Sequence, residues 1–137
     1  MSEQQNVQIV KDAYAAFGRG EIQSILNACA AEIEWVSPGE GYTVAGGTYR
    51  GRDGVGRFFQ IVGQSMDFET FEPRTFVAQG DIVVALGYYR AKMKDTGKTF
   101  ESNWAMAFTI RDGKVVKFEE FANTAALAAA NKAAKAA

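Results

Sequence analysis

TFESNWAMAFTIRDGKVVKFEEFAN, residues 99–123, consists of two alternating stretches on either side of Asp112-Gly113. An Asp-Gly pair between alternating runs is typical of a two-residue β-hairpin turn. With this turn, residues that face each other across the hairpin have numbers that add to 225. Met106 then lies opposite Glu119, and the stretch predicts a pair of antiparallel strands, 99–111 and 114–123.

The first strand of this hairpin has one strongly apolar face. The side chains of that face alternate with polar ones and are Phe100, Trp104, Met106, Phe108 and Ile110. Because cross-strand partners share a face, Glu119, Phe121 and Asn123 are expected to point inward. A one-residue bulge would turn Glu119 outward and Glu120 inward. Lys117, inward and opposite Phe108 in the regular register, is the warning sign of such a bulge.

Two more strands precede the hairpin, over residues 68–78 and 82–94. The turn signals Gln79-Gly80-Asp81 and Thr96-Gly97 separate them and predict an antiparallel meander of four strands. A two-residue turn at Thr96-Gly97 pairs Tyr89 with Trp104 and places Tyr89 on the inner face.

Helices come before these strands. Apolar residues at helical spacing predict helices over 7–17, 22–29 and 55–62, with a short strand at 33–36 and a glycine-rich loop at 37–51. The alanine-rich tail from Thr124 predicts a last helix, with Asn123 or Thr124 as its cap. Helices grouped before an antiparallel sheet indicate an α+β fold in a single domain, residues 1–137.

The outer face of the expected sheet also carries apolar side chains, which are Val84, Leu86, Tyr88, Ala105, Ala107, Val116 and Phe118. An apolar surface of this extent is too large to leave in water. The sequence therefore predicts a homodimer formed through the outer face of the sheet.

Composition restricts the chemistry and the partners. The chain has no histidine, which excludes histidine bases, histidine-ligated metals and Ser-His or Cys-His nucleophiles, so acid–base chemistry must use Asp, Glu, Lys or Tyr. A net charge of −1, with mixed signs, indicates no nucleic-acid or membrane partner. The polar start MSEQQNVQ is unlike a signal peptide, which predicts a cytoplasmic location. Cys29, the single cysteine, is expected to be a buried, inert thiol.

Three stretches resemble a known family: KDAYAAFGRGEIQSILNACAAEIEW, GGTYRGRDGVGRFF and TGKTFESNWAMAFTIRDGKVVKFEEFANTAALAAA. The layout is similar to the SnoaL-like group of the nuclear-transport-factor-2-like superfamily over nearly the whole chain. The resemblance implies a cone-shaped half-barrel, in which a curved, mostly antiparallel sheet wraps around three N-terminal helices and is followed by a short C-terminal helix. It also implies an apolar pocket and dimerisation through the outer sheet face. The same fold serves polyketide cyclases, ketosteroid isomerase and non-enzymatic binding domains.

Two positions depart from the pattern of the cyclases that the chain resembles. Their last strand commonly ends in Tyr-x-Asp-Thr with an acid–base Asp, whereas this chain reads Phe121-Ala122-Asn123-Thr124. An amide can hydrogen-bond a carbonyl or enolate oxygen, but it cannot transfer the proton. Relatives also often place a histidine where this chain has Met106.

Two functional hypotheses follow. In the first, Glu119 is the catalytic base of a cofactor-free cyclase or isomerase acting on a small apolar carbonyl compound, with Asn123, Tyr89 and Trp104 as hydrogen-bond donors. In the second, the domain is a binding or accessory domain that holds a small ligand without converting it and has lost the catalytic Asp of the family it resembles, with Asn123 in its place. Glu119 then pairs with Lys117 or an arginine or faces solvent. The side chains expected to contact the ligand are Tyr14, Trp35, Tyr89, Ser102, Trp104, Met106 and Phe121. No metal is expected.

Overall fold

The computed structural model describes residues 2–131. Four helices and six strands follow one another as α1 (Glu3–Gly18), α2 (Ile22–Ala28), β1 (Cys29–Ser37), β2 (Gly47–Arg50), α3 (Gly51–Ser65), β3 (Met66–Gln79), β4 (Ile82–Met93), β5 (Thr99–Arg111), β6 (Lys114–Ala122) and α4 (Thr124–Asn131). The helices predicted over 7–17, 22–29 and 55–62 and the helix after Thr124 are confirmed, within a few residues at their ends.

The first helix has clear start and stop signals. Ser2 caps α1: its hydroxyl accepts a hydrogen bond from the Gln5 backbone N–H, and the Gln5 side chain accepts one from the Ser2 N–H. This reciprocal pair satisfies two backbone donors that a helix end leaves free. The helix ends before Gly20, whose φ of 73° is readily adopted only by glycine.

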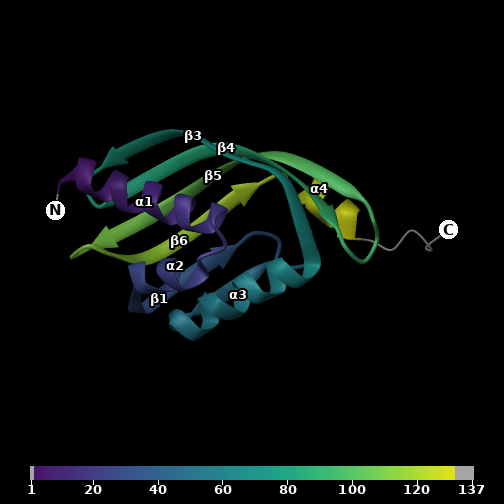
Figure 1. The fold of residues 1–137 in the computed structure, drawn as a ribbon, viewed down its shortest axis with the longest axis horizontal. Helices are drawn as coiled ribbons and strands as arrows, with labels where there is room; N and C mark the ends of the chain where they lie inside the picture. The colour runs from purple at the N-terminus through teal and green to yellow at the C-terminus, as the bar shows by residue number, and fades with distance from the viewer. Residues whose placement is uncertain (1, 132–137) are drawn as a thin grey trace.

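The strands form one mixed sheet in the order β2-β1-β6-β5-β4-β3. β1 and β6 run parallel, and the other neighbours are antiparallel. Figure 1 shows α1, α2 and α3 on one side of the curved sheet and α4 beside the hairpin between β4 and β5. This is the α+β cone fold that the sequence predicts. β2 lies inside the segment predicted as loop, since its four residues pair with the end of β1.

The hairpin between β5 and β6 has the predicted turn. Asp112 and Gly113 have φ values of 52° and 76°, as a two-residue turn of this type requires, and Ile110 pairs with Val115. The register of the two strands then shifts by one residue. The next pair is Thr109 with Lys117, so Val116 has no cross-strand partner and forms a β-bulge. From there on, Met106 lies opposite Glu120.

The bulge reverses the predicted faces of β6. Phe118 is only 2% exposed and Glu120 is 9% exposed, so both point inward, while Phe121 is 53% exposed. The prediction that Glu119 and Phe121 face inward is therefore wrong, and the alternative with a bulge is correct. A single extra residue has this effect because side chains alternate with a period of two along a strand.

The hairpin between β4 and β5 also differs from the predicted register. Tyr89 pairs with Ser102 and not with Trp104. The reason is that the loop between β4 and β5 is longer than the predicted two residues: it is closed by a hydrogen bond from the Met93 backbone N–H to the Lys98 carbonyl oxygen. The shift is by two residues, so Tyr89 stays on the inner face as predicted.

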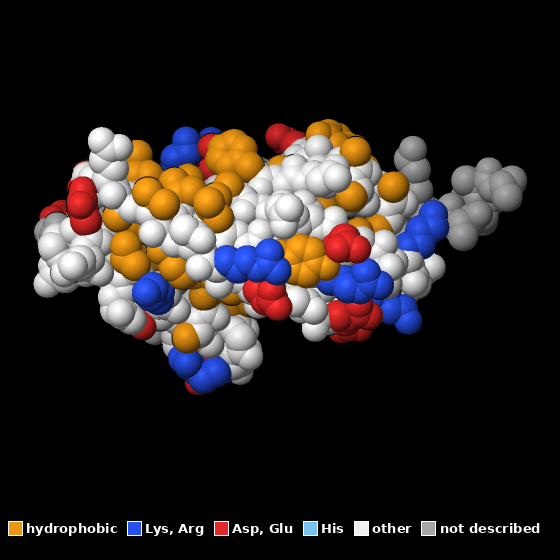
Figure 2. All heavy atoms as spheres, turned by 90° about the horizontal axis from the view of Figure 1, so that it is seen from above, with side chains coloured by type: hydrophobic (Ala, Val, Ile, Leu, Met, Phe, Trp, Pro, Cys, Tyr) orange, Lys and Arg blue, Asp and Glu red, His pale blue; other side chains and the backbone are white. Residues whose placement is uncertain are grey.

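The outer face of the sheet carries an apolar strip. Two rows of neighbours cross it: Val77, Val84 and Ala107 in one, and Leu86, Ala105 and Phe121 in the other. Phe118, predicted here, lies inside the fold, and Phe121 takes its place. Figure 2, seen from above β3 and β4, shows hydrophobic side chains gathered on the surface with charged ones among them. No helix in residues 2–131 is both long and apolar enough to cross a membrane.

Candidate functional site

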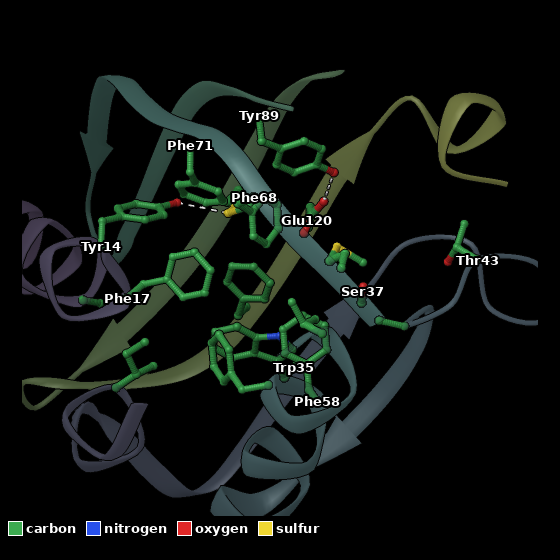
Figure 3. Close-up of a pocket in the computed structure, with 18 of the residues that line it drawn as sticks. Tyr14, Phe17, Trp35, Ser37, Thr43, Phe58, Phe68, Phe71, Tyr89 and Glu120 are labelled. Carbon is green, nitrogen blue, oxygen red and sulfur yellow. Dashed lines mark hydrogen bonds between the residues drawn. The ribbon is translucent and has the colours of Figure 1, made fainter. Parts of the chain in front are cut away.

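A cavity of about 110 Å³ lies between the helices and the inner face of the sheet. This is several times the roughly 10–15 Å³ that one water needs on the same measure. Its wall is mostly apolar and comes from the four helices, the loop between β1 and β2, and all strands except β2. Many of the lining side chains are aromatic; they include Phe108, Phe118 and the rings of Phe17, Phe58 and Phe71 labelled in Figure 3. Trp35 stacks on Phe118 with ring centroids 3.8 Å apart.

Glu120 is the only carboxylic acid among the described residues that line this cavity. The Tyr89 hydroxyl donates a hydrogen bond of 2.7 Å to its Oε2 atom, as Figure 3 shows. Burial raises the pKa of Glu120, because an apolar surrounding disfavours the charged form, and the bond from Tyr89 offsets part of this rise. A carboxylate with a raised pKa is a stronger base than one in water.

Tyr14 supplies a second hydroxyl near this acid. It donates to the Met106 Sδ atom at 3.1 Å, and Met106 is the cross-strand partner of Glu120. Burial first, and the Glu120 charge second, raise the pKa of Tyr14, so its hydroxyl keeps its proton. A thioether is a weak acceptor, and a ligand oxygen would be a better partner for this donor.

Ser37 and Thr43 bring further hydroxyls to the cavity wall. Ser37 ends β1, and Thr43 lies in the loop between β1 and β2, which borders the cavity with Val44 and Ala45. The Thr43 hydroxyl donates to the Pro38 carbonyl oxygen at 2.7 Å. The hydroxyl proton of Thr43 therefore already takes part in a hydrogen bond within the loop and is not available to a ligand.

The fold brings together four of the residues predicted to contact a ligand. Tyr14, Trp35, Tyr89 and Met106 line the cavity. Trp104 is buried but lies outside the lining, against Gly87, where a β-carbon would collide with the indole ring. Its Nε1 atom is buried without a hydrogen-bond partner in the described part of the chain.

The other predicted residues are elsewhere. Glu119 is on the outer face opposite Ala107, and Phe121 is beside it. The Ser102 hydroxyl accepts from the Asn123 backbone N–H and donates to the Asn103 carbonyl oxygen. Asn123 is exposed, and its Oδ1 accepts from the Ala126 N–H at the start of α4. The fold does not place Asn123 in the cavity, because the strand ends at Ala122 and the amide caps the helix that follows.

The sequence reasoning missed Ser37 and most of the phenylalanine wall, and it named Glu120 only as an alternative. The signal for Glu120 was Lys117, which a regular register would have buried opposite Phe108 without a partner. The place of Ser37 beside β6 depends on a parallel pairing between distant segments, which no periodicity in the sequence specifies.

Cys29 also lines the cavity, and it is fully buried. Burial raises the pKa of its thiol to about 11, so the reactive thiolate is disfavoured, in agreement with the prediction of an inert thiol. Within residues 2–131, no three Cys, Asp or Glu side chains gather into a cluster that could hold a metal ion.

Known proteins resemble the chain over most of its length. The model of the SnoaL-like domain matches residues 10–118. A solved structure of an NTF2-like protein from Burkholderia xenovorans LB400 is 41% identical, covers 96% of this chain and 99% of that chain, and superposes with a TM-score of 0.88. TerC, co-crystallized with polyporic acid, is 31% identical with coverages of 92% and 97% and a TM-score of 0.81. An uncharacterized protein of Mycobacterium tuberculosis H37Rv is 24% identical over 124 residues, which are 88% of this chain and 91% of that protein.

Proposed function

Since the chain belongs to the SnoaL-like domain family, we propose that it binds a small, ring-containing carbonyl compound and transfers a proton on it. The reaction would be of the isomerase or cyclase type and would need no cofactor. Glu120 takes the role of the base that the sequence assigned to Glu119.

One observation carries this proposal: Glu120, the one carboxyl group among the described residues that line a mostly apolar cavity, accepts a hydrogen bond from a tyrosine. Tyr89 bonds to Oε2 of Glu120, and no residue in the described part of the chain hydrogen-bonds Oε1. One carboxylate oxygen is therefore free to accept a proton from a ligand, with a raised basicity, in a mostly apolar cavity. Both properties favour the removal of a proton next to a carbonyl group.

The negative charge that forms on the carbonyl oxygen needs a donor. The Tyr14 hydroxyl is suited to this, because it can exchange its weak bond to the Met106 sulfur for a bond to the developing oxyanion. The aromatic wall would hold the ring of the ligand by burial of apolar surface. These residues replace Asn123 and Trp104 as the expected donors.

The experiment is a proton-exchange assay in D₂O. The protein is incubated with 1-phenylbutan-1-one, and NMR follows the loss of the proton signal on the carbon next to the carbonyl. We expect exchange above the buffer rate, and a decrease of about 10²-fold or more in Glu120→Gln, which is the usual contribution of a general base.

Glu119→Gln is the matched control. It makes the same chemical change one residue away, on the opposite face of β6, and should retain the exchange rate. If Glu120→Gln exchanged protons as fast as the wild type, or if Glu119→Gln abolished exchange, the assignment of the base would be wrong.

A second candidate function is ligand binding without conversion. It is favoured by the relation to TerC, a protein of 31% identity that was crystallized with polyporic acid. Calorimetry with polyporic acid tests it directly. Binding of that compound by the wild type and by Glu120→Gln, with no proton exchange on any ketone, would favour a binding protein over an enzyme.

A further inference from the structure

Tyr14, Met106 and Glu120 form a chain of neighbours at the inner face of the sheet. The Tyr14 hydroxyl donates to the Met106 Sδ atom at 3.1 Å, and Met106 lies opposite Glu120 in the ladder between β5 and β6. All three line the cavity, and Figure 3 shows Tyr14 reaching in from α1 with its hydroxyl turned to the side where Glu120 lies. Met106 therefore separates the proposed donor of the site from its proposed base.

Met106 is the long apolar side chain in its row of the sheet. Its neighbour on β4 is Ala85, and both residues are buried. Because alanine carries only a methyl group, the far end of Met106 fills the space beside the Tyr14 hydroxyl. A shorter side chain at this position would leave a gap between Tyr14 and Glu120.

A tyrosine hydroxyl prefers a carboxylate to a thioether as its acceptor, because a hydrogen bond to a charged group is stronger. Tyr89 shows this preference in its 2.7 Å bond to Oε2 of Glu120. Oε1 accepts no bond from residues 2–131, and the charge of Glu120 is close enough to raise the pKa of Tyr14. The other titratable residue of the described wall is Cys29, and no lysine or arginine lines it.

A bond from Tyr14 to Glu120 would harm the proposed reaction in two ways. It would occupy the hydroxyl that is needed at the developing oxyanion. It would also stabilise the carboxylate and so make Glu120 a weaker base. The bond of Tyr14 to the Met106 sulfur avoids both effects.

We propose that Met106 is a positioning residue of this site. Its side chain fills the space between the Tyr14 hydroxyl and Glu120, and its sulfur holds that hydroxyl by a bond weak enough for a ligand to replace. The two reactive groups thereby stay apart until a ligand enters. This inference rests on the proposed function, since it takes Glu120 as the base and Tyr14 as the donor, and it adds a residue that acts through both.

The test is a carboxyl-detected NMR titration of Glu120 in Met106→Val, which shortens the side chain and suits a β-strand. We expect Tyr14 to bond to Glu120 in this variant, so the pKa of Glu120 should fall by about 1, the effect of one hydrogen bond to a charged group. Proton exchange on 1-phenylbutan-1-one should slow about tenfold or more, because the base is weaker and the donor is occupied. Met106→Leu, a swap of similar volume, should retain both values.

A double variant separates this effect from the entry of water, which would also lower the pKa of Glu120. Adding Tyr14→Phe to Met106→Val removes the hydroxyl, and the pKa should return to its value in Tyr14→Phe alone. Ile110→Val is the matched control. It shortens a buried side chain on the same face of β5, but Ile110 pairs with Val115 and lies outside the cavity lining, so the titration of Glu120 should stay in place.

The titration needs no substrate, so it tests Met106 separately from the reaction. An unchanged pKa in Met106→Val, or a fall that persists when Tyr14→Phe is added, would overturn the role of Met106 and leave the proposed function standing. The expected pKa changes in a protein whose wild type exchanges no protons would refute the proposed function, while the separation of Tyr14 and Glu120 by Met106 would stand.

Discussion

Glu120 and Glu119 are adjacent and chemically identical, but they lie in opposite environments. Glu120 lies among aromatic rings, so it has lost most of its water, and burial raises its pKa. The hydrogen bond from Tyr89 favours the charged form and lowers the pKa partway back. The usefulness of this carboxyl group as a base depends on the balance between the two effects.

Tyr89→Phe removes the bond that favours the carboxylate. The pKa of Glu120 should then rise further, and because only the carboxylate accepts a proton, the midpoint of the pH–rate profile for proton exchange should move to higher pH. A carboxyl-detected NMR titration of Glu120 measures the same shift without a substrate.

Tyr88→Phe is the control for this prediction. Tyr88 is the neighbouring residue, and its hydroxyl also donates to a carboxylate at 2.7 Å, but that acid is the exposed Glu101. Its loss should leave the profile in place. A midpoint that stays the same in Tyr89→Phe would mean that this bond does not set the basicity of Glu120.

Strand β6 and helix α4 meet at Asn123, which has a structural task. Its Oδ1 accepts from the Ala126 N–H at 3.1 Å and so caps α4. Leu127 of the same helix lines the cavity, and Thr96 bonds to the carbonyl oxygen of Ala130. The amide in the place of the cyclases' aspartate thus belongs to the element that borders the cavity, with its side chain turned away from the base.

Asn123→Ala should lower the free energy of unfolding by about 1 kcal/mol, the usual cost of losing a cap. Asn123→Asp still accepts the bond and should keep the stability of the wild type. Urea denaturation measures both.

Asn123→Asp also tests the idea of a lost catalytic aspartate. Because the side chain faces solvent at the helix start, we expect no proton exchange from Asn123→Asp combined with Glu120→Gln. Exchange restored in that double variant would show that position 123 reaches the ligand.

At the scale of the whole fold, the described residues 2–131 leave the apolar strip on the outer sheet face without a covering layer. On the outer sheet face Val77, Leu86 and Phe121 are 55%, 44% and 53% exposed, and Val84, Ala105 and Ala107 connect them. The helices cover only the inner face (Figure 1). Two copies that pack these strips together would remove both from water.

We therefore expect the protein to sediment as a dimer at micromolar concentration and Leu86→Lys to sediment as a monomer. A lysine in the middle of the strip would have to be buried without a partner, which is costly. Tyr42→Lys replaces a side chain of similar exposure, 55%, in the loop away from this face, and should remain a dimer. A wild type that sediments as a monomer would refute the expectation.

Local patterns predicted most of the fold. The helical spacing before residue 66, the alternation after it and the Asp112-Gly113 turn all depend on neighbouring residues, and the structure confirms each of them. The inward position of Tyr89 was also predicted correctly. The predicted register of β4 and β5 was wrong by two residues, and a shift by an even number keeps each side chain on the same face of the sheet.

The site depended on contacts that local patterns do not specify. The sequence by itself determined an α+β fold with an antiparallel meander, the absence of histidine from any acid–base chemistry and an acidic pair on the last strand, and the resemblance to SnoaL-like proteins implied the cone shape. Only the tertiary structure decided which acid of that pair enters the cavity, because the β-bulge at Val116 exchanges the inward and outward positions of the residues that follow it on β6. It also decided that Ser37 stands beside Glu120, because β1 and β6, about eighty residues apart, run parallel. Pairing between distant strands leaves no periodic trace in either strand alone.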